Sequence, residues 1–317
     1  MKINIGIVGY GNIGKGVETV LKQNPDMELA AIFERPELAK DSIHSSEDAD
    51  KFVGKIDVML LCCGSAKDTP VLAPRFAERF NTVDSYDTHA KIPEYLETVN
   101  RAALKGRKTA IVSTGWDPGL FSVMDALTEA VLPAGSTNKF WGRGVSQGHS
   151  EAIRRVEGVR AAVQYTIPSQ QAIELARSGP LNMPATEKHI RECFVAAEDG
   201  ADLERIKSEI INMPHYFRGY ETVVHFISED DLKKNHFAMP HAGHVIRLGE
   251  TNGNKQLTEF TLKLESNPEF TASVMVAYAR AAARLCREGN FGAKTVLDVP
   301  VSYLSAKTRD ELIKDYL

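Results

Sequence analysis

Residues 3 to 14 read Ile3-Asn4-Ile5-Gly6-Ile7-Val8-Gly9-Tyr10-Gly11-Asn12-Ile13-Gly14, and this stretch decides the fold. The apolar run at 3–8 is typical of a buried strand, and the pattern G-x-G-x-x-G follows it directly. A lone match to that pattern is weak. Here it leads into a helix-period segment, Ile13 to Gln23, and then into a second apolar run, Leu29 to Phe33. This order predicts a βαβ unit that binds a dinucleotide.

Each glycine has a separate task in such a turn. Gly9 allows the tight turn, Gly11 lets the backbone approach a pyrophosphate, and Gly14 lets the helix pack closely on the strand. The start of the helix then presents N–H groups and the positive end of its dipole to the phosphates. A tight turn without a ligand is the alternative, and the strand and helix around the motif make it the weaker interpretation.

Further apolar runs extend this unit through the first third of the chain, at Val58 to Cys63, Asn81 to Asp84 and Thr109 to Val112. Their alternation with helix-period segments predicts a Rossmann-type, doubly wound parallel sheet of the α/β class. The ligand crevice of such a sheet lies at the carboxyl ends of its strands.

After Gly119 the pattern changes to strands with one polar face. Leu257 to Leu264 alternate strictly, β-rich runs occur at Cys193 to Ala196 and at Val223 to Ile227, and a short helix is expected around Ile206. These features predict a second, α+β domain with an open mixed sheet. The Ala-rich helix Thr271 to Arg287 is expected to return to the first domain, so residues 1–118 with 271–317 form one domain and residues 119–270 the other.

Composition limits the function classes. The 317 residues are 43% hydrophobic and 25% charged, with a formal net charge of -4, which is ordinary for a globular protein of about two domains. Without basic tracts, no nucleic-acid partner is expected. The four cysteines lack zinc-ligand spacing, so no metal site is expected. No signal pattern or apolar run of membrane-spanning length stands out, which predicts a cytoplasmic protein without a membrane partner.

The residues after the second strand bear on the choice of dinucleotide. An acidic residue at this place accepts hydrogen bonds from the free 2′-hydroxyl of NAD, whereas an arginine neutralises the 2′-phosphate of NADP. Glu34 and Arg35 stand there together. These two residues leave NAD and NADP open.

Polar segments follow two of the expected strands, at 84–89 and 113–119, and carry the candidate catalytic residues Asp87 and Asp117. Two carboxylates that face one crevice would suit a cationic amine or raise one another's pKa. The alternatives are structural: Asp87 as a helix cap and Asp117 as a turn residue in Asp-Pro-Gly.

The second domain offers donors for an anion. The glycine-rich segment 140–150 could hold a carboxylate on its backbone N–H groups, and Arg191 could bind one with its planar fork. His244 could add a donor. Taken alone, each of these side chains is more often an ordinary ion-paired arginine or a structural histidine, and His241 with His244 lacks a third metal ligand.

Several motifs together resemble one family, the meso-diaminopimelate dehydrogenases. They are Gly9 to Gly14, Ser113-Thr114-Gly115-Trp116-Asp117-Pro118-Gly119, Phe140-Trp141-Gly142, Gly144-Val145-Ser146-Gln147-Gly148-His149-Ser150, Gln164-Tyr165-Thr166, Met239-Pro240-His241 and Asn267-Pro268. The resemblance runs nearly end to end. It implies a homodimeric, NADP-dependent oxidoreductase of lysine biosynthesis, which oxidatively deaminates the D-centre of meso-2,6-diaminopimelate to L-2-amino-6-oxopimelate and ammonia.

The resemblance also implies site residues. Asp87 and Asp117 would hold the D-centre ammonium, with Trp116 and Trp141 as walls. Ser146, Gln147 and Gly148 would take the proximal carboxylate, and Thr166, Arg191, His244 and Asn267 the distal end. The implied cofactor contacts are Gly9, Tyr10, Gly11, Asn12, Ile13, Gly14, Arg35, Cys63, Gly64 and Ser65. The second domain would bind substrate and form the dimer.

One residue departs from the family pattern, since a small neutral or basic residue is expected where Glu34 stands. A carboxylate near a 2′-phosphate costs affinity, so Glu34 weakens the expected preference for NADP over NAD. The rival functions are a sugar dehydrogenase of similar two-domain architecture and a non-catalytic dinucleotide sensor. Segment 83–89 contains no lysine, which disfavours the sugar dehydrogenase, and the density of matched pocket residues disfavours the sensor.

Overall fold

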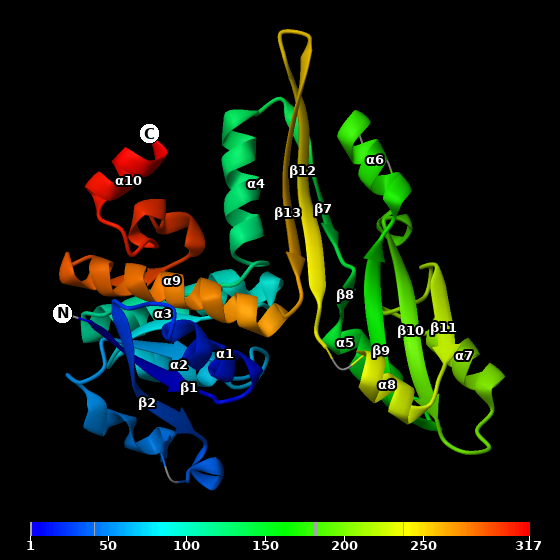
Figure 1. The fold of residues 1–317 in the computed structure, drawn as a ribbon, viewed down its shortest axis with the longest axis horizontal. Helices are drawn as coiled ribbons and strands as arrows, with labels where there is room; N and C mark the ends of the chain where they lie inside the picture. The colour runs from blue at the N-terminus through cyan, green and yellow to red at the C-terminus, as the bar shows by residue number, and fades with distance from the viewer. Residues whose placement is uncertain (1, 41, 180–182, 237) are drawn as a thin grey trace. The chain divides into compact units, whose positions relative to one another are not determined.

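The computed structural model describes residues 2–40, 42–179, 183–236 and 238–317. The chain divides into two compact units. Unit 1 comprises Met1–Val123 and Pro268–Leu317, and unit 2 comprises Met124–Asn267 (Figure 1). These bounds lie within a few residues of the expected domain limits, and the roles assigned to the two domains remain predictions.

Unit 1 is built on a parallel sheet with the order β14-β6-β5-β4-β1-β2-β3. Its strands are β1 (Ile3–Val8), β2 (Met27–Glu34), β3 (Ile43–Ser45), β4 (Val58–Leu61), β5 (Asn81–Asp84), β6 (Thr109–Ile111) and β14 (Gly292–Lys294). The central strand β1 pairs with β2 on one side and β4 on the other. The winding therefore reverses at β1, which is where ligands bind in sheets of this kind.

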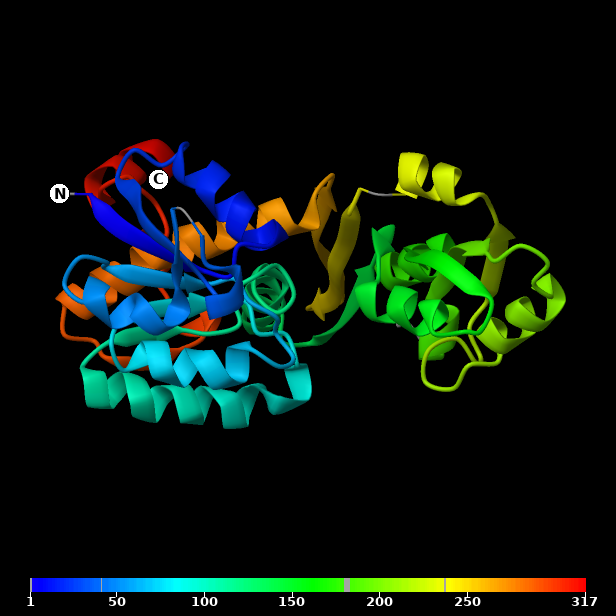
Figure 2. The same ribbon diagram turned by 90° about the horizontal axis from the view of Figure 1, so that it is seen from below.

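Helices cover both faces of this sheet, and a separate apolar core fills each face. Residues of α1 (Asn12–Leu21) and α9 (Asn267–Arg287) share one core, and residues of α2 (Thr69–Ala77) and α3 (Ile92–Gly106) share the other. Figure 2 shows the sheet between these two layers. The doubly wound fold class is confirmed.

The remaining elements of unit 1 are short. They are η1 (Pro36–Leu38), η2 (Ser46–Phe52), η3 (His89–Lys91), η5 (Val296–Asp298), η6 (Val301–Tyr303) and α10 (Arg309–Tyr316). Helix α4 (Leu120–Val131) begins in unit 1 and continues into unit 2.

The Ala-rich helix α9 belongs to unit 1 from Pro268 onward. Small side chains such as Ala272 and Ala279 on α9 are buried in the same core as β1 and α1. A Cβ at Gly16 of α1 would lie 3.0 Å from the Cβ of Ala272, so the two helices approach closely. Arg280 fixes the contact, because it donates to both carboxylate oxygens of Asp26, at 2.7 and 2.9 Å, and to the carbonyl of Leu304.

Unit 2 contains the expected mixed sheet, but the alternating run at 257–264 lies in a second, antiparallel sheet that the sequence did not predict. The mixed sheet has the order β11-β10-β9-β8 and the antiparallel one β13-β12-β7. The strands are β7 (Gly135–Trp141), β8 (Gly144–Val145), β9 (Val159–Pro168), β10 (His189–Ala197), β11 (Thr222–Phe226), β12 (His241–Thr251) and β13 (Asn254–Leu264).

Helices pack on both sheets of unit 2. They are α5 (Gln147–Arg154), α6 (Gln170–Ser178), α7 (Leu203–Ile211) and α8 (Glu229–His236), with η4 (Ala185–Glu187) between α6 and β10. The expected helix around Ile206 is α7, whose Ile206 and Ile210 are buried with Val195 of β10. Within the described part of the chain, no helix is both long and apolar enough to cross a membrane.

Candidate active site

The glycine-rich turn has the geometry that a dinucleotide requires. Gly9 has a φ of 90°, and a Cβ there would lie 2.9 Å from the carbonyl carbon of Cys62. A Cβ at Gly14 would lie 2.2 Å from the carbonyl oxygen of Gly9. By contrast, no atom lies within 4 Å of a Cβ built at Gly11, so the backbone is open to a ligand there. Turn, open approach and close helix packing are the three tasks expected of these glycines.

The start of α1 is suited to phosphate. Gly11 is the N-cap residue and has no side chain to accept the first N–H groups of the helix, and the first turn carries no acidic residue. The positive end of the helix dipole therefore faces the glycine turn, and no acidic side chain of the helix's own first turn neutralises it. Together with the turn, this fits a bound dinucleotide.

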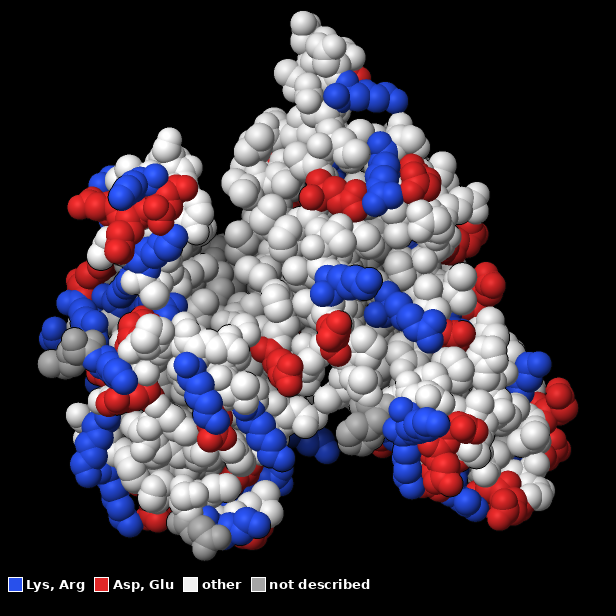
Figure 3. Space-filling model, in the orientation of Figure 1, with Lys and Arg blue, Asp and Glu red and all other residues white. Residues whose placement is uncertain are grey.

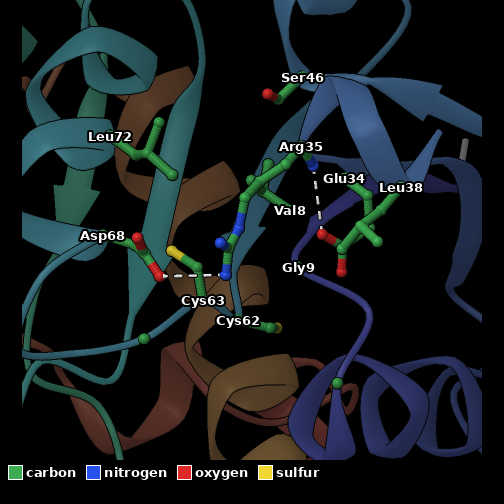
Figure 4. Close-up of a pocket in the computed structure, with 12 residues that line it drawn as sticks. Val8, Gly9, Glu34, Arg35, Leu38, Ser46, Cys62, Cys63, Asp68 and Leu72 are labelled. Carbon is green, nitrogen blue, oxygen red and sulfur yellow. Dashed lines mark hydrogen bonds and ion pairs between the residues drawn. The ribbon is translucent and has the colours of Figure 1, made fainter.

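A pocket of about 220 Å³ lies at the carboxyl ends of β1, β2 and β4 (Figure 4). It is lined by Val8, Gly9, Gly11, Glu34, Arg35, Leu38, Ser46, Cys62, Cys63, Gly64, Asp68 and Leu72. Five of the expected cofactor residues line it together, namely Gly9, Gly11, Arg35, Cys63 and Gly64. The structure thus brings the loops after β1, β2 and β4 to one site, as the strand order requires.

The two cysteines of this pocket are thiols. Burial raises the pKa of the Cys62 thiol strongly and also raises that of Cys63. Cys63 Sγ lies 3.5 Å from Thr69 Oγ1, at the start of α2. Neither cysteine has the lowered pKa of a nucleophile, so both serve the pocket as small, neutral side chains.

Charged side chains face each other across the pocket. The guanidinium of Arg35 lies 3.9 Å from a carboxylate oxygen of Asp68. On the opposite wall, Glu34 accepts a hydrogen bond from the Tyr10 N–H at 2.5 Å, and its other oxygen accepts from the Arg35 N–H at 3.2 Å. The Tyr10 hydroxyl donates to Glu18 on α1. The Glu34 carboxylate therefore binds the backbone of the glycine turn and also lines the pocket.

Asp87, an expected catalytic residue, is joined to Ser65, an expected cofactor residue. Ser65 Oγ donates to Asp87 Oδ1 at 2.5 Å, and the Asp87 N–H donates back to Ser65 Oγ at 3.0 Å. The helix-cap interpretation of Asp87 is wrong, because the N-cap residue of η3 is Thr88. Asp87 is exposed at the carboxyl end of the sheet, beside the loop that follows β4.

The sequence did not single out Asp84, the last residue of β5, although it organises both candidate loops. Its carboxylate accepts from the Tyr95 hydroxyl at 2.6 Å and from the N–H groups of Tyr86 and Ser113 at 3.0 and 3.1 Å. Complete burial raises the pKa of Asp84, and these hydrogen bonds oppose that rise. One buried carboxylate thus fixes the segments that carry Asp87 and Asp117. The position of Asp84 at the end of a predicted strand was the one feature of the sequence that could have indicated this role.

Asp117 lies in a turn whose ends pair with each other. Trp116 and Gly119 form an antiparallel bridge around it, and Gly119 has a φ of 141°. Trp116 is 7% exposed and contacts Phe121 edge to face, with ring centroids 5.1 Å apart. The turn interpretation of Asp117 is therefore compatible with the structure, the residue is half-buried, and its catalytic role remains a prediction.

In unit 2, the start of α5 offers an anion site. Ser146 is the N-cap residue, and its Oγ lies 2.7 Å from His149 Nδ1. Gln147 and Gly148 form the first turn, and a Cβ built at Gly148 would have no neighbour within 4 Å. Burial, followed by the charge of Arg191, lowers the pKa of His149 to about 4, so this histidine is neutral at pH 7.

Arg191 and Thr166 lie directly opposite each other on β10 and β9. A guanidinium nitrogen of Arg191 donates to Thr166 Oγ1 at 2.5 Å, and the guanidinium stacks 4.3 Å from the ring of Tyr220. Arg191 is only 9% exposed, and its Nε is buried without a hydrogen-bond partner. A buried guanidinium with an unused donor is prepared for a carboxylate.

His189, which the sequence did not single out, positions Trp141. Its Nε2 accepts the Trp141 backbone N–H at 3.0 Å, and the two rings lie 5.6 Å apart. Burial, followed by the charges of Arg191 and Lys188, lowers the pKa of His189 to about 4. The acceptor role of Nε2 requires the same neutral form.

His244 lies on the antiparallel sheet. Its Nδ1 lies 3.1 Å from Glu259 and 3.0 Å from Thr261, and Arg177 holds Glu259 with two hydrogen bonds. Asn267, at the start of α9, donates its backbone N–H to the carbonyl of Met239 at 2.9 Å. The structure therefore does not pair His244 with Arg191 directly, and their joint role remains a prediction.

Charges of both signs alternate over the face of the molecule drawn in Figure 3. Basic and acidic side chains lie close together over most elements of this face. Among the described residues on this face, Lys and Arg do not form the continuous basic stripe that is typical of nucleic-acid binding.

Comparisons with known proteins agree on one family. Residues 115–266 match the family model "Diaminopimelic acid dehydrogenase C-terminal domain". The chain is 55% identical to the meso-diaminopimelate D-dehydrogenase of Ureibacillus thermosphaericus over 100% of this chain and 99% of that protein.

Two solved structures are similar over 100% of both chains. One is a meso-diaminopimelate dehydrogenase mutant from Clostridium tetani E88 with diaminopimelate, at 50% identity and a TM-score of 0.95. The other is an engineered D-amino acid dehydrogenase bound to NADP+, at 45% identity and a TM-score of 0.86.

Proposed function

The chain belongs to the meso-diaminopimelate dehydrogenase family, and from this membership we propose its reaction. The protein is an NADP-dependent amino-acid dehydrogenase. With water and NADP+, it converts the D-centre of meso-2,6-diaminopimelate to L-2-amino-6-oxopimelate, ammonia, NADPH and a proton, reversibly. The observation that carries the proposal is the similarity over the whole of both chains, which includes both units.

Unit 1 holds the cofactor in this proposal. Gly9 to Gly14 bind the pyrophosphate, Arg35 receives the 2′-phosphate, and Cys63, Gly64 and Ser65 contact the cofactor from the loop after β4. The open backbone at Gly11 and the uncapped start of α1 support this assignment. Once bound, NADP supplies a nicotinamide ring that accepts a hydride from the substrate's α-carbon.

Asp117 and Asp87 are the proposed catalytic residues. The D-centre ammonium must lose a proton before hydride can leave its carbon, so a base is required. Either carboxylate can hold the ammonium and take that proton, directly or through water. Trp116, whose ring is fixed by Phe121, forms an apolar wall beside Asp117.

Unit 2 supplies the groups that bind carboxylates. The start of α5, with Ser146, Gln147 and Gly148, takes the proximal carboxylate, and Trp141 forms a wall. Thr166, Arg191, His244 and Asn267 bind the distal, L-configured end. The buried guanidinium of Arg191 with its unused Nε supports this role. We also propose that the protein is a homodimer, and the apolar side chains of Leu127 and Val131, 53% and 72% exposed, are candidates for its interface.

The direct test is an absorbance assay with NADP and meso-diaminopimelate. The expected result is substrate-dependent reduction of NADP with release of ammonia. A protein that binds NADP but shows no reduction with this substrate would contradict the proposed reaction and favour a sensor. Analytical ultracentrifugation tests the homodimer separately, and a single monomeric species at micromolar concentration would refute it.

A further inference from the structure

The pocket at the end of β2 carries groups for two different cofactors. Glu34 and Arg35 are neighbours in sequence, and both line the pocket. An acidic residue at this place accepts a ribose 2′-hydroxyl, and an arginine pairs with a 2′-phosphate.

Glu34 is held ready as an acceptor. Its two carboxylate oxygens accept one backbone N–H each, from Tyr10 and from Arg35. A carboxylate has about four acceptor positions, so each oxygen can accept a further hydrogen bond. The two N–H groups fix the carboxylate against the glycine turn, where a ribose hydroxyl could donate to it without rearrangement of the side chain.

Arg35, in contrast, is already paired within the protein. Its guanidinium lies 3.9 Å from Asp68, and the Arg35 side chain is 65% exposed (Figure 4). The charged side chains that line the pocket are Glu34, Asp68 and Arg35, one more acid than base. A 2′-phosphate, with nearly two negative charges, would meet the two carboxylates of Glu34 and Asp68 as well as the single guanidinium of Arg35.

We propose that this pocket accepts NAD as well as NADP, with Glu34 receiving the 2′-hydroxyl of NAD and Arg35 receiving the 2′-phosphate of NADP. The inference rests on the proposed function and deepens it, because it makes Glu34 the residue that limits the preference for NADP.

The test is calorimetric titration of the full chain with NADP+ and with NAD+, in the absence of substrate. Dissociation constants within about tenfold of each other are expected for the parent, since the pocket contains a partner for each ribose. Glu34→Gln keeps an acceptor for the Tyr10 N–H and removes the charge. This variant is expected to bind NADP+ about fivefold more tightly than the parent and to bind NAD+ a few fold more weakly.

Glu37→Gln is the matched control. It removes the same charge from an exposed residue three positions along, which does not line the pocket. Both cofactors should bind this variant as they bind the parent. Titration with 2′,5′-ADP and 5′-AMP locates the effect at the ribose, because these fragments lack the nicotinamide half.

A parent preference for NADP+ above about tenfold would overturn the inference, as would a ratio that Glu34→Gln changes no more than Glu37→Gln does. Both readouts are independent of catalysis. Cofactor binding without diaminopimelate-dependent reduction would refute the proposed reaction and leave the inference intact.

Discussion

At the scale of single residues, Arg191 has an unusual position for a cation. It is nearly buried, and among the described residues no carboxylate lies within ion-pair distance of its guanidinium. Burial of an unpaired charge is costly, so the folded protein gains when an anion arrives. The Thr166 hydroxyl and the ring of Tyr220 fix the guanidinium in the meantime.

Arg191→Lys should therefore affect substrate binding more than catalysis. The lysine keeps the charge and loses the fork, so we expect KM for diaminopimelate to rise about tenfold or more while kcat changes by less than about threefold. Steady-state kinetics with saturating NADP measures both. A fall in kcat with KM unchanged would contradict the role as a carboxylate clamp.

His189 makes unit 2 sensitive to acid. Its pKa in the folded protein is about 4, below the ordinary value of 6.5, so the unfolded chain binds more protons between these values. The contribution of His189 to the unfolding free energy is fully present above pH 6.5 and is lost as the pH falls toward 4. We expect His189 to account for about 2 kcal/mol of lost unfolding free energy between pH 7 and pH 5.

Urea unfolding of His189→Gln at the two pH values measures this contribution. The Gln carbonyl can still accept the Trp141 N–H but cannot titrate, so the variant should lose less stability on acidification than the parent. His215→Gln, at an exposed position, is the control and should behave like the parent. Equal losses in His189→Gln and the parent would show that His189 is not the titrating group.

At the scale of elements, the contact between α1 and the turn after β1 allows the effect of a substitution on folding to be measured separately from its effect on cofactor binding. Gly14 has no room for a Cβ, and Gly11 has open space. The two glycines of one motif therefore allow two different disruptions of the same turn.

Gly14→Ala should destabilise the protein by about 1–3 kcal/mol, because the methyl group would press against the Gly9 carbonyl. Gly11→Ala should leave the unfolding free energy within about 0.5 kcal/mol of the parent and weaken NADP+ about tenfold or more, since its methyl enters the space for the pyrophosphate. Thermal unfolding and cofactor titration measure the two effects. Stable Gly14→Ala protein with parental affinity would contradict the packing argument.

The sequence predicted elements with clear periodicity and missed those without it. The strand at 81–84 and the strand at 3–8 are confirmed to the residue, and the others to within a few residues. The three-residue strands β3 and β14 are too short to show a period. The second sheet of unit 2 was missed because only one of its three strands, β13, was predicted, and periodicity does not reveal which strands pair.

The candidate site divides in the same way. The cofactor turn is local in sequence, so its glycines could be assigned before the structure. The pair Arg191 and Thr166 is separated by 25 positions and depends on the register of β9 and β10. Asp84 and His189 act through burial and hydrogen bonds to distant backbone, and neither leaves a motif.

At the scale of the whole molecule, Arg280 joins three distant parts of unit 1. It binds Asp26, before β2, and the carbonyl of Leu304, from the middle of α9. The bidentate pair also lowers the pKa of Asp26. Because the Arg280 side chain is 4% exposed, loss of the guanidinium would leave the Asp26 carboxylate without its main partner.

Arg280→Met should lower the unfolding free energy by about 2–3 kcal/mol, because it removes charge-assisted hydrogen bonds to an Asp26 carboxylate that is itself 33% exposed. Arg284→Met, one helical turn further, removes a single hydrogen bond to the Ser302 carbonyl and should cost about 1 kcal/mol. Urea unfolding compares the two variants. Equal costs would argue against Arg280 as the anchor of the returning helix.

The return of α9 to unit 1 has a consequence for the order of events during synthesis. A ribosome releases residues 1–123 first, but the core on one face of their sheet is completed by side chains between Ala272 and Leu285. Unit 2, at 124–267, is complete before those residues emerge. Unit 1 is therefore translated first but completes its core last. The apolar side chains of β1 and α1 can be buried only after α9, more than 250 residues later in the chain, has been translated.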